Sequence, residues 1–472
     1  MMLEKLVCKI DATLIDAWKI INENGKGIVF VVDDEGKLSG VLTDGDIRAH
    51  LLEERNFIVL VSDLMNRDFV FARDDQEYDD LIKLFNEEIS IVPIIDDNYK
   101  LIDYMEFNKT LRIPVALPDL KGKEFEYLTD AFLSTWISSS GKYIDMFESK
   151  FSSFCGSNYG IAVSNGTVAL QLALEALGIG EGDEVIVPDF TFAATINSVL
   201  HVNATPVIVD IEEESWCIDP KEIVKAITPN TKAIIAVHIY GQVCDMDSIM
   251  EIAKTNNLFV IEDCAEAHGA SYNEKKVGSI GDIGCFSFFA NKVITTGEGG
   301  MCVTNRKDLD NIMRLLRDHG MNKEKRYWHD LVGHNFRMTN LQASIGVAQT
   351  ERIEQILLDR SNIEESYKKE LGQVNKLVFQ NNSLPNRNKV TWFVSILVLN
   401  KRDLIIDKLS AEGIDVRPFF FPLSSMPIYK TYVFSSRKSM EISRLGINLP
   451  TNKMINKDII LKIKTVFLDI LN

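Results

Sequence analysis

Two residues with complementary chemistry follow two apolar runs in the middle of the chain. The run 258–261 leads into Asp263, and the run 283–289 leads into Lys292. Short apolar runs are typical of buried strands, which would deliver both side chains at the carboxyl edge of a sheet. A lysine amine can bond to a carbonyl, and a buried carboxylate can keep a heterocyclic nitrogen protonated. These are the groups that pyridoxal 5'-phosphate (PLP) chemistry requires; the alternative is a surface lysine and a solvated aspartate.

A third feature of the same kind precedes them in the chain. Ser164, Asn165, Gly166 and Thr167 separate a predicted strand at 161–163 from a predicted helix. The first backbone N–H groups of a helix, together with its dipole, favour an anion such as a phosphate. An ordinary helix cap is the alternative interpretation.

The elements around these residues alternate between strand and helix. The predicted strands are 184–187, 206–210, 233–238 and 258–261, and the predicted helices are 193–202, 220–227 and 246–256. This alternation predicts a mostly parallel sheet with helices on both faces, in which ligands bind at the carboxyl ends of the strands. A small α+β domain is expected at 351–472.

Composition excludes several classes of protein. The net charge of −17 argues against nucleic acid as a partner. No apolar run reaches the length of a membrane span, so we expect a cytoplasmic protein with no membrane contact. Seven scattered cysteines without metal-ligand spacing predict reduced, buried thiols and no metal site.

The acidic charge belongs to the N-terminus, which contains an internal repeat. Residues 1–110 hold 12 Lys and Arg against 24 Asp and Glu, whereas the rest of the chain holds 39 against 44. VVDDEGKL at 31–38 recurs as IIDDNYKL at 94–101, and a predicted helix precedes each copy, at about 11–24 and 75–88. The repeat resembles a pair of CBS domains, 1–58 and 59–111. This resemblance implies a site for an adenine or guanine nucleotide at Thr43 and Asp46, with a ligand-free assembly module as the alternative.

From residue 112 onward, the motifs resemble those of a known enzyme family. They are SNGTVAL, PDFTFAAT, HIYGQVCDMD, IEDCAEAHGA, GDIGCFSFFANK, TTGEGG, GHNFRMTNLQA and RPFFFPL, in this order. The chain is thereby identified as similar to the sugar aminotransferases of DegT/DnrJ/StrS type, which have PLP fold type I. The resemblance implies a large PLP-binding domain at 112–350 and a small domain at 351–472. TWISSSG, RYW and RPFFFPL are most similar to GDP-perosamine synthases.

The resemblance also assigns residues. Lys292 would carry PLP and move protons, Asp263 would pair with the pyridine nitrogen, and Phe192 would stack on the ring. Gly166, Thr167 and Ser287 would hold the phosphate, Asn335 would reach it from a second subunit, and Glu266 would lie near the phenolic oxygen. The candidates for contact with the sugar nucleotide are Trp136, Ser138, Ser139, Arg326, Tyr327 and Arg417.

The implied reaction moves an amino group from L-glutamate to a nucleotide-linked 4-keto-6-deoxy-hexose. The expected product is GDP-perosamine, for surface polysaccharide such as O-antigen, made by a homodimer or higher homo-oligomer. Lysine at position 292 favours amination, because family members that dehydrate sugars carry histidine there. The alternatives are an aminotransferase for a UDP- or dTDP-linked 4-keto-sugar, and a non-catalytic regulator that senses PLP or a nucleotide.

Overall fold

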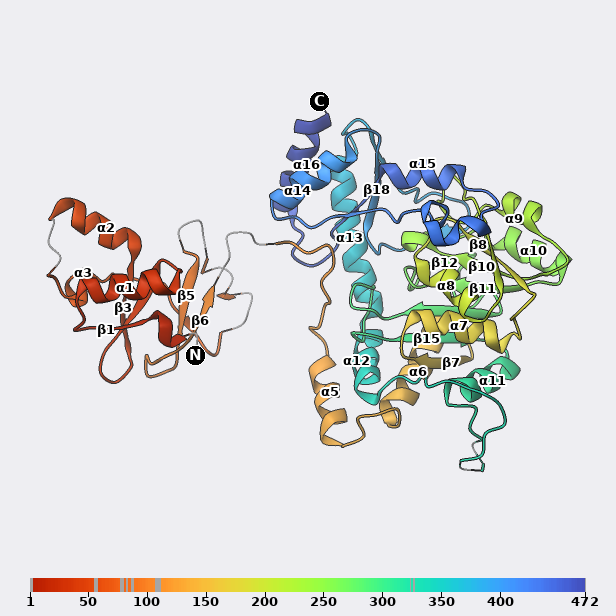
Figure 1. Cartoon of the computed structure of the whole chain (residues 1–472), viewed down its shortest axis with the longest axis horizontal. Coiled ribbons are helices and arrows are strands. Elements are labelled where there is room, and N and C mark those ends of the chain that lie inside the picture. Colours follow the sequence, from red (N-terminus) through yellow and green to blue (C-terminus); the bar gives the residue numbers. More distant parts are fainter. Residues whose placement is uncertain are drawn as a thin grey trace. The chain divides into compact units, whose positions relative to one another are not determined.

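The computed structural model divides the chain into two compact units, residues 1–111 and 112–472 (Figure 1). It describes residues 3–54, 58–76, 80–81, 84–85, 89–106, 112–322, 324–325 and 327–471. Most of the helix predicted over 75–88 lies outside the described residues. No helix in the described part of the chain is both long enough and apolar enough to cross a membrane.

The first unit contains the predicted repeat as two small sheets. Its elements are η1 (Leu3–Leu6), β1 (Val7–Lys9), α1 (Leu14–Asn24), β2 (Ile28–Val32), β3 (Leu38–Thr43), α2 (Asp44–Glu53), α3 (Val61–Leu64), β4 (Ala72–Arg73), β5 (Ile91–Ile95) and β6 (Leu101–Glu106). The sheet β1-β2-β3 and the sheet β4-β5-β6 each have a parallel pair followed by an antiparallel pair. Each sheet also has a register shift, between Val31 and Val32 and between Ile94 and Ile95. The two shifts stand 63 residues apart, like the sequence repeat.

The turns of the two repeats are built in the same way and contact each other. Asp33 Oδ1 accepts from the backbone N–H groups two and four residues further on, and Asp96 Oδ1 does the same in the second copy. Lys37 and Lys100 form an antiparallel bridge between the copies. The structure therefore confirms the internal repeat and pairs its halves at equivalent positions.

The second unit is organised around a seven-stranded sheet in the order β7-β15-β14-β11-β10-β8-β9. Its strands are β7 (Tyr159–Val163), β8 (Glu184–Pro188), β9 (Thr205–Val209), β10 (Thr231–Val237), β11 (Phe259–Asp263), β14 (Ile283–Ser287) and β15 (Gly300–Thr304). All five positions of β14 and of β15 are buried, so both faces of the sheet are covered there. This confirms the predicted α/β class with its mostly parallel sheet.

Helices precede, connect and follow the strands of this sheet. They are α5 (Glu124–Leu133), α6 (Lys142–Cys155), α7 (Gly166–Ala176), α8 (Ala193–His201), α9 (Pro220–Ala226), η2 (Ile239–Gly241), α10 (Met246–Asn256), α11 (Lys307–Arg317) and α12 (Asn340–Glu351). β15, which was not predicted from the sequence, runs antiparallel to both β14 and β7. No helix separates β14 from β15 in the structure, and the chain returns through a loop that includes Lys292.

The C-terminal part adds the four-stranded sheet β16-β18-β20-β19, and its strand β17 pairs with β12 of the preceding part in the small sheet β13-β12-β17. The elements are β12 (Ser271–Tyr272), β13 (Lys275–Lys276), α13 (Ile353–Leu371), β16 (Leu377–Phe379), β17 (Arg387–Asn388), β18 (Val394–Val398), α14 (Arg402–Ala411), β19 (Arg417–Pro418), η3 (Leu423–Ser425), η4 (Pro427–Tyr432), α15 (Arg437–Leu445), β20 (Gly446–Leu449) and α16 (Lys457–Leu471). Helix α13 packs against α16 (Figure 1). All seven cysteines are buried as free thiols, as predicted.

Candidate active site

The predicted chemical residues meet in one cavity at the carboxyl edge of the large sheet. β11 and β14 are parallel neighbours, which places Asp263 opposite Cys285 and brings the loop after β14 beside the end of β11. The cavity has a volume of about 590 Å³. Seven predicted residues line it: Gly166, Thr167, Phe192, Asp263, Glu266, Ser287 and Lys292.

Asp263 is held in place as an acceptor. Its Oδ2 accepts from Thr195 Oγ1 at 2.8 Å, and its Oδ1 accepts from the Ala265 N–H at 3.2 Å. Burial raises the pKa of Asp263, whereas the Thr195 hydroxyl, the Ala265 N–H and the Lys292 ammonium oppose the rise. A cationic ring nitrogen facing this carboxylate would favour its ionised form further.

The neighbouring carboxylate, Glu262, has a different role. Its Oε1 accepts from the N–H groups of residues 280 and 281, and its Oε2 accepts from the N–H of Gly278 and contacts His238 Nε2 at 3.2 Å. His238, Glu262 and Cys264 place possible metal-ligand atoms within 4.8 Å of one another. Because Glu262 already satisfies three backbone donors and an imidazole, we assign it to fixing the 278–281 turn.

Lys292 lies between an acid and an aromatic ring. Its Nζ is 3.8 Å from Glu266 Oε1 and 4.2 Å from the ring centroid of Trp392. Burial lowers the pKa of Lys292, and the Glu266 and Asp263 carboxylates oppose that effect. An amine that loses its proton more readily than free lysine is suited to nucleophilic and acid–base chemistry.

Glu266 shares this buried environment. Its Oε2 accepts from the Tyr240 N–H at 2.8 Å. Burial raises the pKa of Glu266 to about 7, against the stabilising effect of the Lys292 ammonium on its charged form. Tyr240 has left-handed backbone dihedrals (φ 51°, ψ 32°), which cost energy in a non-glycine residue and orient its N–H towards Glu266.

The opposite end of the cavity is suited to an anion. Helix α7 begins at Gly166, and Asn165 Oδ1 caps it by accepting from the Val168 N–H at 3.0 Å. The N–H groups of Gly166 and Thr167 have no helical partner, because they belong to the first turn. A Cβ on Gly166 would lie 2.7 Å from Ser287 Cβ, so only glycine lets the helix start this close to Ser287.

These residues fit PLP. The cavity volume lies within the roughly 300–1,000 Å³ range of small-ligand sites. Glycine-lined helix N–H groups and Ser287 suit the phosphate, Asp263 suits the pyridine nitrogen, and Lys292 suits the aldehyde. Phe192 is exposed, and its ring lies 5.7 Å from that of Phe420 at the cavity wall.

A second cavity of about 630 Å³ shares a wall with the first. Thr191, Phe192, Phe289, Asn291, Trp392 and Phe420 line both. Arg417 lines the second cavity and forms an ion pair with Asp415 at 3.0 Å. The predicted sugar-nucleotide residue Arg417 therefore lies next to the Lys292 cavity.

Four other predicted substrate residues, which are Trp136, Ser138, Ser139 and Tyr327, lie outside the linings of both cavities. The backbone carbonyls of Trp136 and Ser138 accept from Asn340, and the loop that also holds Ser139 is largely exposed. Tyr327 is exposed as well. Arg326 lies outside the described residues.

Asn335 and the predicted nucleotide residues of the first unit, Thr43 and Asp46, form hydrogen bonds within the chain. Asn335 is exposed and accepts from Arg337 Nε at 3.0 Å. Thr43 and Asp46 form the capping box of α2, in which each side chain accepts from the other's backbone N–H. Their hydrogen bonds thus support the ordinary helix-cap role, and the nucleotide role stays a prediction.

Two residues at the site were missed from the sequence. Thr195 belongs to the PDFTFAAT motif, four residues after Thr191. Two threonines at this spacing at the start of a predicted helix could have indicated that both side chains point to one side. Trp392 follows an irregular segment a hundred residues after Lys292, and no local pattern marks it. Only the tertiary structure brings Trp392 to the amine.

The fold and this site define a PLP-dependent aminotransferase. The sequence pattern of the DegT/DnrJ/EryC1/StrS aminotransferase family matches residues 118–467, and that of the CBS domain matches 1–53 and 61–104. The chain belongs to the DegT/DnrJ/EryC1/StrS aminotransferase family and carries CBS domains at its N-terminus. The predicted family, fold type and cofactor are confirmed.

Relatives and a solved structure each match more than two thirds of the chain. GDP-perosamine synthase of Caulobacter vibrioides is 47% identical over 346 residues, which are 72% of this chain and 93% of that protein. GDP-perosamine synthase of Escherichia coli O157:H7 is 46% identical over 341 residues, again 72% and 93%. A candidate sugar aminotransferase of Streptococcus pneumoniae, solved in its PLP form, is 28% identical with a TM-score of 0.72, covering 76% of this chain and all of that one.

Proposed function

We propose that this aminotransferase makes GDP-perosamine from GDP-4-keto-6-deoxymannose, with L-glutamate as the amino donor. The observation that carries the proposal is that two cavities share an aromatic wall: Lys292 and Asp263 line one cavity, and Arg417 lines the other. The names of the two relatives, each matched over 93% of its length, support the choice of sugar nucleotide. The product would serve surface polysaccharide synthesis.

In this proposal each residue has a stated task. Bound PLP would supply an electron-accepting ring. Lys292 Nζ would hold the cofactor, and as a free amine it would take and return the proton that moves during transfer. Asp263 would keep the ring nitrogen of the cofactor protonated, and the Thr195 hydroxyl orients the Asp263 carboxylate by donating to it. L-Glutamate leaves as 2-oxoglutarate, and the carbonyl carbon of the sugar receives the amine.

The remaining contacts position the ligands. Gly166, Thr167 and Ser287 would hold the phosphate, and Phe192 would cover one face of the ring. Arg417 would bind the diphosphate, since a guanidinium forms paired hydrogen bonds with phosphate oxygens. Trp136, Ser138, Ser139, Arg326 and Tyr327 would complete the sugar-nucleotide site.

Completion of that site requires a second copy of the chain. The exposed apolar side chains of α5 and the following loop include Phe125 (81% exposed), Phe132 (63%), Leu133 (72%) and Trp136 (62%). A surface of this kind is typical of a protein interface. We infer a homodimer or higher homo-oligomer in which Asn335 reaches the phosphate of the partner. Light scattering after gel filtration tests this; a monomer at working concentration would contradict it.

The substrate is tested by direct turnover. The protein is incubated with L-glutamate and, separately, GDP-, UDP- and dTDP-linked 4-keto-6-deoxy sugars, and products are weighed by mass spectrometry. We expect the exchange of a carbonyl oxygen for an amine on the GDP sugar. Exclusive turnover of a UDP or dTDP sugar would support the alternative substrate and refute the GDP assignment.

A further inference from the structure

Trp392 lies against the reactive amine although it is distant from it in sequence. Its indole ring is almost fully buried, at 2% exposure, just before β18. The Lys292 Nζ lies 4.2 Å from the ring centroid. An ammonium at this distance from an indole face is attracted by the negative charge on the face of the ring.

The amine has an anion on another side. Glu266 Oε1 is 3.8 Å from Lys292 Nζ, and the second oxygen of Glu266 is held by the Tyr240 N–H. The Tyr240 and Trp392 rings are themselves stacked, with centroids 6.0 Å apart. A carboxylate and an aromatic face thus bound the position of the free amine.

The orientation of Trp392 towards Lys292 is fixed by hydrogen bonds. Its Nε1 donates to the carbonyl of Asn291, the residue before Lys292, at 2.7 Å. Its own carbonyl accepts from Arg360 Nη1 at 2.7 Å and from Thr451 Oγ1 at 2.8 Å. Arg360 Nη2 also lies 3.5 Å from the carbonyl of Lys292. One guanidinium therefore reaches the backbone of both residues.

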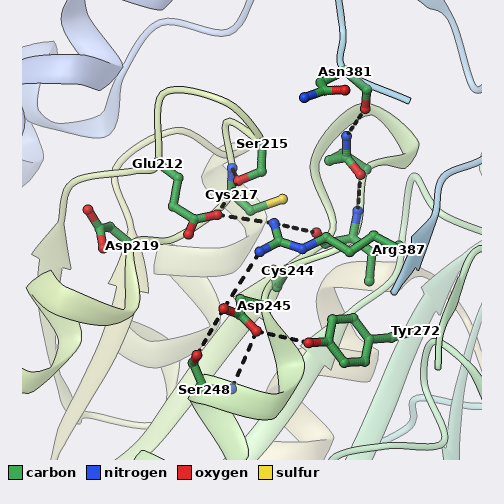
Figure 2. A network of polar contacts seen from close by, with 12 residues as sticks. Glu212, Ser215, Cys217, Asp219, Cys244, Asp245, Ser248, Tyr272, Asn381 and Arg387 are labelled. Carbon is green, nitrogen blue, oxygen red and sulfur yellow. Dashed lines mark hydrogen bonds and ion pairs between the residues drawn. The ribbon is translucent and has the colours of Figure 1, made fainter. Parts of the chain in front are cut away.

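The segment that leads to Trp392 is anchored as well. Figure 2 shows Arg387 between two carboxylates, with Nη1 3.1 Å from Glu212 Oε2 and Nη2 3.7 Å from Asp245 Oδ2. Further along, the Val390 N–H donates to the carbonyl of Gly241 at 3.0 Å. A Cβ on Gly241 would lie 2.0 Å from the Val390 carbonyl oxygen, so this close approach requires glycine.

We propose that Trp392 is a positioning residue that, together with Glu266, holds the free amine of Lys292 in place whenever the amine is not bonded to the cofactor. The proposal rests on the proposed role of Lys292. An amine that must take a proton and return it benefits from a fixed location, because misplacement by about an ångström is costly in catalysis. The ring supplies that location without adding a further acid to Glu266 and Asp263.

The charges around the amine determine in which direction the loss of the Trp392 ring should shift the pKa of Lys292. Glu266 and Asp263 face Lys292 and favour the ammonium. Burial and the Lys292 ammonium lower the pKa of His268 to about 3, so its imidazole carries no charge near neutral pH. The Arg360 guanidinium lies at the backbone carbonyl of Lys292. The indole face also favours the ammonium, and its removal should lower the pH at which Lys292 becomes a free amine. Admission of water to a vacated pocket would have the opposite effect, because burial lowers the pKa of Lys292.

The test measures the amine directly in the full chain freed of cofactor. Trp392→Leu and Trp392→Phe proteins are acylated briefly with acetic anhydride over a pH series, and the Lys292 peptide is quantified by mass spectrometry. Labelling is expressed relative to its plateau at high pH, which removes differences in access. Thermal melting confirms that each variant is folded, and Trp392→Phe keeps an aromatic face if the leucine variant fails to fold.

We expect Trp392→Phe to follow the wild-type profile. At a fixed pH below the midpoint, relative labelling of Lys292 in Trp392→Leu should rise roughly threefold to tenfold. An unchanged or higher midpoint in the leucine variant would overturn the proposal, and so would an equal shift in both variants, which would assign the effect to the lost Nε1 hydrogen bond. Because neither cofactor nor substrate is present, these outcomes are independent of whether the proposed amino transfer occurs.

Discussion

Burial changes the acids and the base of this site in opposite directions. It raises the pKa of Asp263 and Glu266 and lowers the pKa of Lys292. Each group is thereby moved away from its fully charged form, and the hydrogen bonds from Thr195 and Tyr240 keep the carboxylates oriented. The chemistry of the site depends on these surroundings as much as on the residue types.

Gly166 provides a test of the phosphate end. In Gly166→Ala the new Cβ would lie 2.7 Å from Ser287 Cβ, so either α7 or Ser287 must move. We expect PLP affinity to fall about tenfold to hundredfold, in line with the cost of overpacking. Fluorescence titration of the cofactor-free protein measures the change.

Gly180→Ala is the matched control. Its Cβ would meet the Val202 carbonyl oxygen at 3.6 Å, which is an ordinary contact. Its PLP affinity should equal that of the wild type. Equal affinities for Gly166→Ala and Gly180→Ala would contradict the phosphate assignment.

Much of the residue-scale site could be predicted, because strand ends and a helix start leave local signals. Asp263, Gly166 and Lys292 each follow a recognisable apolar run or precede a helical one. Trp392 could not be predicted, since its proximity to Lys292 depends on Arg360 and on the packing of a distant segment.

At the scale of elements, the parallel neighbours β11 and β14 bring acid and base together. The alternation of strands and helices predicted this arrangement from 184 to 263, and α10 matches its predicted range, 246–256. β15 was missed because an antiparallel return needs no intervening helix, so the alternation rule has no signal for it.

His268 contacts the end of β14 and makes the unfolding free energy depend on pH. Its Nε2 lies 2.9 Å from the Ser287 carbonyl, and burial lowers the pKa of His268 from 6.5 to about 3. Between these values the unfolded chain binds one more proton than the folded chain. The stabilisation of the folded chain by neutral His268 is therefore complete above the pKa of His268 in the unfolded chain. It is lost as the pH falls towards 3, at about 1.4 kcal/mol per pH unit.

Urea unfolding at several pH values in this window measures the slope. His268→Gln should reduce the dependence of the unfolding free energy on pH by one proton, whatever its effect on absolute stability. An identical slope in the variant would show that His268 is not held neutral.

Arg387 stabilises the segment that leads towards Trp392. Its side chain is 10% exposed and lies between Glu212 and Asp245 (Figure 2). Arg387→Met would leave two partly buried carboxylates without this cation, and we expect a loss of about 3 kcal/mol in unfolding free energy. Urea-induced unfolding of the full chain measures it.

Arg437→Met is the control for charge alone. Arg437 is 88% exposed and pairs with Glu441 at 3.3 Å. An exposed pair of this kind contributes about 0–1 kcal/mol, so its loss should be small. Equal effects of the two substitutions would contradict a structural role for the Arg387 network.

At the scale of the whole molecule, an acidic repeat unit accompanies the catalytic unit. The 63-residue offset predicted the repeat, and the structure shows it down to the register shift. The ligand of this unit could not be predicted from the sequence alone. Thr43 and Asp46 are typical both of a nucleotide contact and of a helix cap. We propose adenine or guanine nucleotide binding there.

A second capping box makes the nucleotide proposal testable. Thr13 and Asp16 cap α1 in the same way as Thr43 and Asp46 cap α2. Asp16→Asn and Asp46→Asn should each weaken the capping box of their own helix, because each replaces the N3 carboxylate that accepts from the N-cap backbone N–H. Only Asp46→Asn should abolish the rise in melting temperature that adenine or guanine nucleotides produce in the full chain. Equal nucleotide responses in the two variants would contradict a site at Asp46.

We propose that Lys292 is the residue to which PLP is bonded. The most direct test is borohydride reduction of the PLP-loaded full chain, followed by proteolysis and mass spectrometry of the peptides. We expect a pyridoxyl phosphate group on Lys292 alone, lost when L-glutamate is added before reduction. An unmodified Lys292 peptide, or a label on another lysine, would contradict the account.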